Sequence, residues 1–379
     1  MIIGIDGNEA NVQNRVGSNV YAYELLSALH ELIRVDKTKQ VRVYLKQDRQ
    51  TTLPGILTNW DYKTFGPSLA WTQWRLPLEL TLEKLSGKAP DIYFSPGHYS
   101  PRFSSVPTVV TIMDLAYLMF PDDFRGSDLR QLKAWTRRSV KKASHILAIS
   151  QSTKDDIVKH YRINPEKITV TYPGLSLKVS KKPGDNSFKN LQAYLGITRP
   201  YLIYVGTLQP RKNISALLDS FTILKKQFPK LKLVIVGKKG WLYDEIFTKV
   251  KNLKLRSEVI FTGYVSNFEK YELLRHAQAF ILPSLYEGFG LPVLEAMALD
   301  VPVIVSRVSS LPEVGGEAAF YIDDPKSAQN IAQVTSSVLQ LSVNRLKEIQ
   351  AKGRAQALKF TWQDCAQKTL TVLEHLARK

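Results

Sequence analysis

The chain has 379 residues, 44% of them hydrophobic and 10% aromatic, which is enough for two cores and excludes disorder as its dominant state. Its net charge of +18 points to nucleic acid, an anionic membrane surface or phosphorylated small molecules as partners, or else to a basic surface kept for solubility. No window approaches the roughly 20 apolar residues of a membrane span, and the single cysteine, Cys365, excludes an internal disulfide and fits a reducing compartment.

The first half of the chain alternates apolar runs with segments of helical period. Its N-terminus, MIIGIDGNEA, has no basic leader and no long apolar core, so we expect a first strand in a cytoplasmic protein rather than a signal peptide. This order predicts a parallel sheet with helices on both faces. The expected strands are Ile2–Asp6, Val41–Leu45, Asp91–Phe94, Thr108–Met113, His145–Ile149 and Ile168–Thr171, and the helices between them include Tyr21–Ile33 and Leu129–Lys142.

The helix expected at Leu129–Lys142, LRQLKAWTRRSVKK, has six Lys and Arg residues beside Leu129, Leu132, Trp135 and Val140. Apolar and basic faces together are typical of a helix that lies on a membrane surface. The alternative, which we favour, is a helix that covers the sheet with its apolar face, because some face of it must do so.

A polar stretch divides the chain at about 175–200. Its segment LSLKVSKKPGDNSFKN contains a Pro-Gly step and several lysines, and it predicts a linker or an exposed loop. After it the alternation restarts, with a helix at Ile214–Phe228. The expected strands are Tyr201–Val205, Leu231–Val236, Val259–Thr262, Ala279–Leu282 and Pro302–Ser306. We therefore expect an α/β protein of two Rossmann-like, doubly wound lobes that face a central cleft, with ligands at the carboxyl ends of strands.

The segment Ser284–Leu299, SLYEGFGLPVLEAMAL, joins a strand to a helix through a glycine-rich turn. Its glycines let the backbone approach a ligand, and the free N–H groups at the start of the helix favour an anion. Two glutamates flank the turn, and a carboxylate accepts two hydrogen bonds from vicinal hydroxyls, one carboxylate for a sugar and one for a ribose. The alternative is an ordinary turn with solvated glutamates. The candidate residues for binding a sugar nucleotide are Glu287, Gly288, Phe289, Gly290, Leu291 and Glu295.

A second turn, in YLIYVGTLQPRKNI, supplies positive charge. Gly206 ends the strand, and we expect Asn213 to cap the next helix. Arg211 and Lys212 stand where strand ends meet a ligand, and they suit the oxygens of a diphosphate. Alone, such a pair is usually solvated. Together with the glutamate segment, it predicts a site for a nucleoside diphosphate.

The E-x7-E spacing of Glu287 and Glu295 in EGFGLPVLEAMA resembles the retaining glycosyltransferases of group 1, or family 4, which have the GT-B fold. VGTLQPRKNI, SSLPEVGGEAAFYIDDP and FTWQDCAQKTLTVL are similar to other segments of that family, and the resemblance covers essentially the whole chain. It implies that Arg211 and Lys212 neutralise the donor diphosphate. It further implies that Glu287, as a catalytic residue, contacts the donor sugar and that Glu295 binds the ribose.

The resemblance also implies the domain organisation. We expect an acceptor-side lobe at 1–175, a linker at 176–199, a nucleotide-sugar-binding lobe at 200–358, and a last helix at 359–379 that crosses back to the N-terminal lobe.

The N-terminal half matches the family less closely. Gly17, in NRVGS, is the one glycine left where the family has a glycine-rich loop that faces the donor phosphate. VVTIMDLAYLMFP resembles a segment ending in His-Asp, which makes Asp114 a second candidate catalytic residue, but Met113 stands at the histidine position and cannot share a proton. His98, in SPGHYSP, is a candidate substitute, and the alternative is a surface histidine.

The resemblance implies transfer of a mannose- or glucose-type hexose from a GDP- or UDP-sugar to a glycan or lipid-linked acceptor, with retention of configuration. The leaving diphosphate needs charge stabilisation more than protonation, so we expect neither a metal nor a cofactor beyond the donor co-substrate. Alternatives of the same fold are a sugar-nucleotide epimerase and a glycan phosphorylase. A nucleic-acid-binding protein is an alternative of another class that only the charge supports, so we expect no nucleic-acid partner. An anionic membrane surface, with the protein peripheral on its cytoplasmic face, is a further candidate partner.

Overall fold

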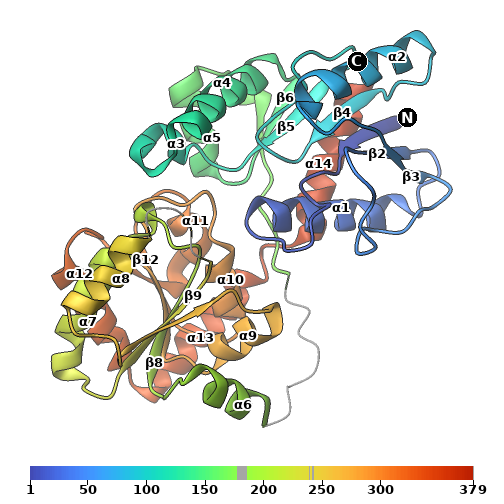
Figure 1. The fold of residues 1–379 in the computed structure, drawn as a ribbon. Coiled ribbons are helices and arrows are strands. Elements are labelled where there is room, and N and C mark those ends of the chain that lie inside the picture. The colour runs from blue at the N-terminus through green and yellow to red at the C-terminus, as the bar shows by residue number, and fades with distance from the viewer. Residues whose placement is uncertain (177–185, 239, 241–242, 379) are drawn as a thin grey trace. The chain divides into compact units, whose positions relative to one another are not determined.

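The computed structural model describes residues 1–379 except 177–185, 239, 241–242 and 379. The chain forms two compact units, one made of Met1–Gly174 with Phe360–Lys379 and the other of Leu175–Lys359. Each unit is a parallel β-sheet covered by helices (Figure 1), so the expected two-sheet α/β architecture is confirmed. None of the helices in the described part of the chain is long and apolar enough to cross a membrane.

The first unit has a seven-stranded sheet in the order β3-β2-β1-β4-β5-β6-β7. The chain moves outward from β1 to β3, returns to β4 and continues to β7, so the direction of winding reverses between β1 and β4. A crevice for ligands forms at such a reversal, at the carboxyl ends of the strands. The strands are β1 Ile2–Asp6, β2 Gln40–Leu45, β3 Trp60–Thr64, β4 Ile92–Ser95, β5 Thr108–Ile112, β6 His145–Ala148 and β7 Ile168–Val170.

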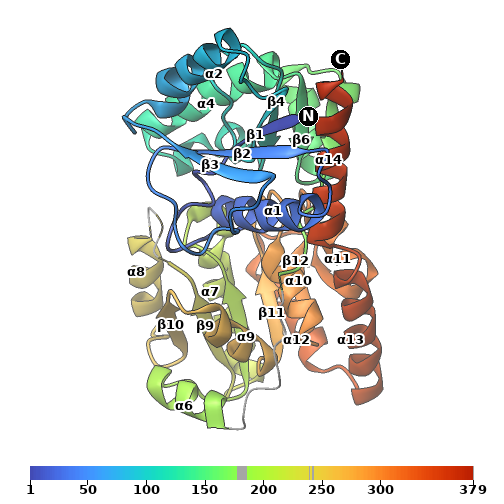
Figure 2. The same ribbon diagram turned by 90° about the vertical axis from the view of Figure 1, so that its right-hand side faces the viewer.

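Helices cover both faces of this sheet (Figure 2). On one face α1 packs against α14, with the Tyr21 and Trp362 rings edge to face at 5.7 Å. On the other, Leu76 and Leu80 of α2 are buried against Tyr44 and other core residues. A π-helical turn, Trp71–Arg75, leads into α2. The helices are α1 Ser18–Ile33, α2 Leu76–Leu85, α3 Ala116–Met119, α4 Gly126–Lys142, α5 Gln151–Tyr161 and α14 Trp362–Ala377, with 3₁₀ turns at Pro121–Asp123 and Pro165–Lys167.

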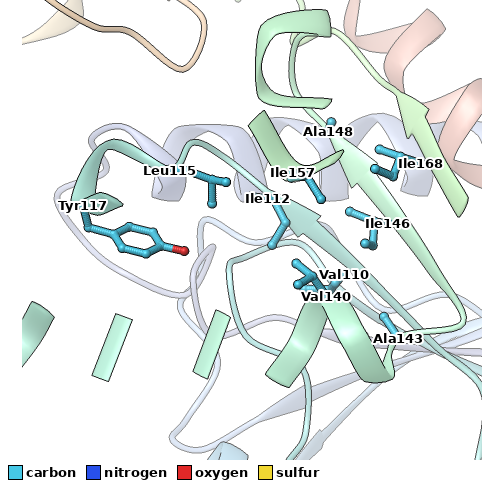
Figure 3. Packing of buried hydrophobic residues seen from close by; sticks show 10 residues of the cluster. All are labelled: Val110, Ile112, Leu115, Tyr117, Val140, Ala143, Ile146, Ala148, Ile157 and Ile168. Atoms are coloured by element: carbon cyan, nitrogen blue, oxygen red, sulfur yellow. The ribbon is translucent and has the colours of Figure 1, made fainter. Parts of the chain in front are cut away.

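Helix α4 covers the β5–β7 part of the sheet. Its Val140 is fully buried in a cluster with Val110 and Ile146 (Figure 3), and Leu129 and Leu132 pack against the same cluster. No large apolar side chain of α4, all of whose residues the structure describes, is exposed. The sheet-covering interpretation of this helix is therefore confirmed, and its basic side is left without an exposed apolar partner.

The second unit has a six-stranded parallel sheet in the order β10-β9-β8-β11-β12-β13, and its winding reverses between β8 and β11. The strands are β8 Tyr201–Val205, β9 Lys232–Val236, β10 Val259–Gly263, β11 Ala279–Leu282, β12 Val303–Ser306 and β13 Ala319–Ile322. The helices are α6 Asn186–Leu195, α7 Ile214–Gln227, α8 Asp244–Asn252, α9 Asn267–Arg275, α10 Leu291–Ala298, α11 Leu311–Gly315, α12 Ala328–Leu339 and α13 Val343–Ala357, with 3₁₀ turns at Pro210–Lys212 and Gly316–Ala318.

Part of the segment expected as a linker is helical. Helix α6 buries Phe188 and Leu191, and the Phe188 ring stacks on the His276 ring at 3.6 Å. Its two apolar anchors stand three residues apart among polar neighbours, which is why composition indicated a loop. Residues 177–185 of that expected linker lie outside the described residues.

Candidate active site

The two motifs of the second unit follow neighbouring strands at the reversal point of the sheet. One loop leaves β8 and carries Arg211; the other leaves β11 and carries Tyr286. The backbone N–H of Leu285 donates to the Arg211 carbonyl at 2.8 Å, and the Arg211 Nη1 donates to the Tyr286 carbonyl at 3.1 Å. The structure therefore brings together two segments that lie about 75 residues apart in the chain.

Glu287 is a buried carboxylate surrounded by donors. Only 6% of the residue is exposed, Lys212 Nζ lies 2.6 Å from each of its oxygens, and the Ser284 hydroxyl donates to Oε1 at 2.7 Å. Arg211 Nη1 is 4.0 Å from Oε2. Burial raises the pKa of the Glu287 carboxyl, but the Lys212 and Arg211 cations outweigh it and hold the pKa below its ordinary value. Glu287 is thus an ionised acceptor at neutral pH.

The backbone around Glu287 is fixed by two serines that follow β12. The Glu287 N–H donates to the Ser309 hydroxyl at 2.9 Å, and the Ser310 hydroxyl donates to the carbonyls of Glu287 and Phe289 at 2.9 and 2.8 Å. Both serines lie in the segment SSLPEVGGEAAFYIDDP, in which the sequence indicated no role for them. They are missed supporting residues, and a hydroxyl pair preceding Leu-Pro was their only signal.

The turn between the glutamates is packed rather than solvated. Gly288 is buried, Phe289 is 4% exposed, and Gly290 has a φ of 115°, which only glycine adopts without strain. Helix α10 starts at Leu291, and Pro292 is its second residue. Because Glu287 and Glu295 are both buried, the alternative of solvated glutamates is wrong.

Glu295 lies on α10 and is 8% exposed. Lys270 of α9 donates to its Oε1 at 2.6 Å. Its Oε2 is buried and has no hydrogen-bond partner among the described residues. A buried carboxylate oxygen without a donor is costly, so this atom is suited to accept a hydrogen bond from a ligand hydroxyl. Lys270 was not predicted, because a lone lysine 25 residues before its partner gives no signal in the sequence.

The loop after β8 is held by close backbone contacts. The Gly206 N–H donates to the Val236 carbonyl at 2.9 Å, and a Cβ on Gly237 would stand 1.9 Å from the Gly206 carbonyl oxygen. Asn213 stands at the N-cap position of α7, as expected, but its side chain does not cap the helix: the residue has a φ of 58°, and its side chain donates to the Pro283 carbonyl at 2.9 Å and to that of Pro325. Asn213 therefore ties the β8 loop to the β11 loop.

The first unit places its predicted residues after three adjacent strands. Gly17 directly precedes α1 and has a positive φ of 53°. Asp114 follows β5 and accepts from the Ala116 N–H at 3.0 Å, while Met113 beside it is buried.

His98 follows β4 and is half-buried, and its Nδ1 has no partner among the described residues. Burial lowers the pKa of His98 below its usual value, and the carboxylates of Asp114 and Glu9 act in the opposite direction. The interpretation of His98 as a simple surface residue does not fit this burial.

Comparisons with known proteins give the family and the fold. The family model of the group 1 glycosyl transferases matches residues 189–356, and that of glycosyltransferase family 4 matches residues 16–179. The chain is 31% identical to the O-antigen chain mannosyltransferase B of Escherichia coli over 291 residues, 75% of this chain and 74% of that protein. It is 28% identical to the O-antigen chain mannosyltransferase RfbU of Salmonella typhimurium over 332 residues, 84% of this chain and 88% of that protein.

Solved structures at lower identity share the fold. WaaG, a glycosyltransferase involved in lipopolysaccharide biosynthesis, has a TM-score of 0.71 at 18% identity, covering 98% of this chain and 99% of its own. Anabaena Alr3699/HepE in complex with UDP and glucose has a TM-score of 0.72 at 18% identity, with the same coverage.

Proposed function

The chain belongs to the group 1 glycosyltransferases, and we propose that it transfers a mannose- or glucose-type hexose from a GDP- or UDP-sugar to a glycan or lipid-linked acceptor, with retention of configuration. The observation that carries this proposal is the buried Glu287, held beside Lys212 and Arg211 at the reversal point of a parallel sheet. The names of the two O-antigen mannosyltransferases support mannose and a polysaccharide acceptor, and the UDP complex of HepE keeps a UDP-sugar as the alternative donor.

The chemistry of the leaving group assigns Arg211 and Lys212. A nucleoside diphosphate departs with its negative charge already present, so fixed cations stabilise it better than a proton donor would. Arg211 presents a planar fork of donors and Lys212 a point charge, and both lie beside Glu287 of the loop that leads into α10, whose first amides favour an anion. This arrangement supports departure without a metal ion.

Glu287 and Glu295 are assigned to the two halves of the donor. The Glu287 carboxylate is ionised and is held by Lys212 and Ser284, so it can accept hydrogen bonds from hydroxyls of the hexose and orient it. Glu295 offers its buried Oε2 to a ribose hydroxyl, while Lys270 holds Oε1 in place.

Residues of the first unit complete the proposal. Asp114 is assigned as a catalytic residue and Gly17 as backbone that faces the donor phosphate, both on the resemblance of their segments to the family. We assign to His98 the proton-sharing role that the buried Met113 cannot perform, because its Nδ1 is buried without a partner among the described residues and Asp114 acts on its charge.

A donor screen followed by a product assay tests the proposal. Thermal shift with GDP-mannose, UDP-glucose and ADP-glucose should single out one donor, because a bound ligand stabilises the folded state. Incubation of that donor with an acceptor oligosaccharide, followed by proton NMR of the new anomeric centre, should show retention, and a chelator should leave the rate largely unchanged. Conversion of the donor without any acceptor would identify an epimerase instead, and loss of activity that magnesium restores would refute the metal-free mechanism.

A further inference from the structure

Helix α2 and the residues next to it expose several large apolar side chains on the first unit. Trp74, Leu78 and Leu82 are spaced four residues apart and therefore share one helical face, which Leu85 extends. We call the group the α2 apolar surface, and its exposed fractions lie between 45% and 85%. Its members are Leu69, Trp74, Leu78, Leu82, Leu85 and Phe103.

The α2 apolar surface does not contribute to the core of the first unit. The opposite side of α2 already buries Leu76 and Leu80 against the sheet, so the helix is apolar on two sides. The Trp74 and Phe103 rings meet edge to face at 6.1 Å, and the Arg102 guanidinium lies 4.7 Å from the centre of the Trp74 indole. Large apolar side chains that are grouped on one exposed helical face mark an interaction site, because leaving them in water is unfavourable.

The charges around the surface have one sign. Lys84 and Lys88 are exposed beside the leucines. The two carboxylates of α2 are turned inward: Glu79 pairs with Lys63 and Arg75 at 2.6 and 2.7 Å, and Glu83 is 5% exposed. Glu83 accepts from Arg42, Lys63 and Tyr44. From residue 74 to residue 88, every exposed side chain is thus apolar, small or basic.

We propose that the α2 apolar surface docks on an anionic membrane. Leucines and a tryptophan enter the boundary between headgroups and acyl chains, while lysines at the rim contact lipid phosphates, which is the pattern of a helix lying in a membrane interface. A second copy of this chain is a poorer partner, because it would bring two basic rims together. Helix α4 has the charge for such contact but has its apolar side chains in the core. The inference goes beyond the proposed transfer reaction and does not depend on it.

Vesicle cosedimentation tests the proposal. The protein should bind vesicles of phosphatidylcholine with 30% phosphatidylglycerol and bind pure phosphatidylcholine much more weakly. A variant with Leu78→Gln, Leu82→Gln and Leu85→Gln should lose at least about tenfold in affinity for the anionic vesicles. The matched control is Val35→Gln, Val343→Gln and Leu358→Gln, which changes three residues that are 67–76% exposed elsewhere, and it should bind as the parent does. Equal binding by the two triple variants would overturn the proposal.

Two tryptophans distinguish α2 from α4 and keep the proposal testable if the triple variant folds poorly. Trp74 belongs to the α2 apolar surface, and Trp135 lies on α4. Vesicles that contain brominated lipid should quench the tryptophan fluorescence of the parent protein. The Trp74→Phe substitution should remove most of this quenching, whereas Trp135→Phe should leave it unchanged. The reverse result would place the contact on α4. A dimer that the leucine substitutions dissociate, in a protein that ignores vesicles, would assign the surface to a second copy and refute the membrane partner.

Discussion

At the scale of single residues, the site depends on Glu287, a carboxylate that is buried but remains charged. Taking the Lys212–Glu287 pair out of water offsets much of its Coulomb attraction, so such a pair contributes little to stability compared with a well-packed apolar pair. Its value is positional: Glu287 stays ionised and oriented, and Lys212 is held where a diphosphate oxygen could take over part of its coordination.

Replacing Glu287 by Gln should therefore affect turnover far more than folding. The amide keeps the shape of the side chain but removes the negative charge that orients the hexose, and we expect a fall in kcat of about 100-fold or more. Glu258→Gln is the matched control, because Glu258 pairs with Lys225 and Lys232 outside the site. Steady-state kinetics on both folded variants gives the answer, and near-normal turnover of Glu287→Gln would remove this residue from the site.

Glu295 makes a prediction about the ribose. If its free Oε2 accepts a ribose hydroxyl, the parent should bind the 2′,3′-dideoxy form of its nucleoside diphosphate about tenfold more weakly than the natural form. In Glu295→Gln this difference should shrink, because a weaker acceptor lowers the affinity only of the ligand that has the ribose hydroxyls. Calorimetric titration of the parent and of Glu295→Gln with the natural and the dideoxy ligand measures the coupling energy between Glu295 and the ribose hydroxyls. An undiminished difference in the variant would place the ribose elsewhere.

His145 makes a prediction about pH. Burial, followed by the nearby cations of Lys167, Lys154 and His375, lowers its pKa from 6.5 to about 4. The folded state thus keeps the imidazole neutral, while the unfolded chain takes up a proton as the pH falls below 6.5. The free energy of unfolding should fall by about 1–2 kcal/mol from pH 7.5 to pH 5 through this group alone.

Urea unfolding at the two pH values checks this. His145→Gln should remove that share of the pH dependence, because an amide does not titrate. The variant should still fold, because the amide can reach the Thr169 hydroxyl, which lies 2.8 Å from the imidazole Nε2. The same substitution at the exposed His160 should leave the pH dependence as it is. If His145→Gln unfolds with the parent's pH dependence, the imidazole is not held neutral.

At the scale of elements, strands that form an apolar run were predictable, whereas two of the four edge strands, β3 and β13, were not. β8, β11 and β12 are apolar runs buried at every position, and the sequence located each to within one residue. β3, with the sequence WDYKT, lies at the sheet edge with mostly polar side chains, and it gave no apolar run to recognise. β13 is likewise an edge strand, with only Ile322 fully buried.

The residues of the site also fall into a predictable group and an unpredictable one. Glycines, carboxylates and cations in the two strand-end loops could be predicted, because short segments with fixed spacing form them and adjacent parallel strands bring their ends together. Lys270, Ser309 and Ser310 come from other elements, and only tertiary packing places them against Glu295 and Glu287. The missing side-chain cap at Asn213 has a related reason. This side chain donates to the Pro325 carbonyl, which is more than 100 residues away in the chain, and does not accept from the start of α7.

Helix α14 joins the first unit through a close contact that Gly174 allows. A Cβ at this position would stand 2.1 Å from the Trp362 backbone nitrogen, so Gly174→Ala must displace the start of α14. We expect a loss of at least about 2 kcal/mol in the stability of this unit, with faster amide exchange in α14 and α1. Gly126→Ala, where a Cβ would meet nothing within 4 Å, is the control and should change stability by less than about 0.5 kcal/mol. Equal stability of the two variants would contradict this packing.

At the scale of the whole molecule, the chain combines an excess of positive charge with a site proposed for an anionic donor. The chain has 52 Lys and Arg residues against 34 Asp and Glu residues, and several carboxylates in the described part of the chain are already paired inward. A field of this sign raises the local concentration of anions and speeds their capture, and salt screens it over about 10 Å at 0.1 M. The charge should therefore appear in the kinetics of donor binding rather than in the chemical step.

Raising potassium chloride from about 0.05 to 0.5 M should lower kcat/KM for the nucleotide-sugar several-fold, mainly through KM, with kcat nearly constant. Initial rates at saturating acceptor across a donor series separate the two parameters. An uncharged solute such as sucrose at the same osmolality is the control, because it changes water activity without screening charge. If kcat falls while KM stays constant, salt acts on the chemical step or on a conformational step, and donor capture does not depend on the charge of the whole molecule.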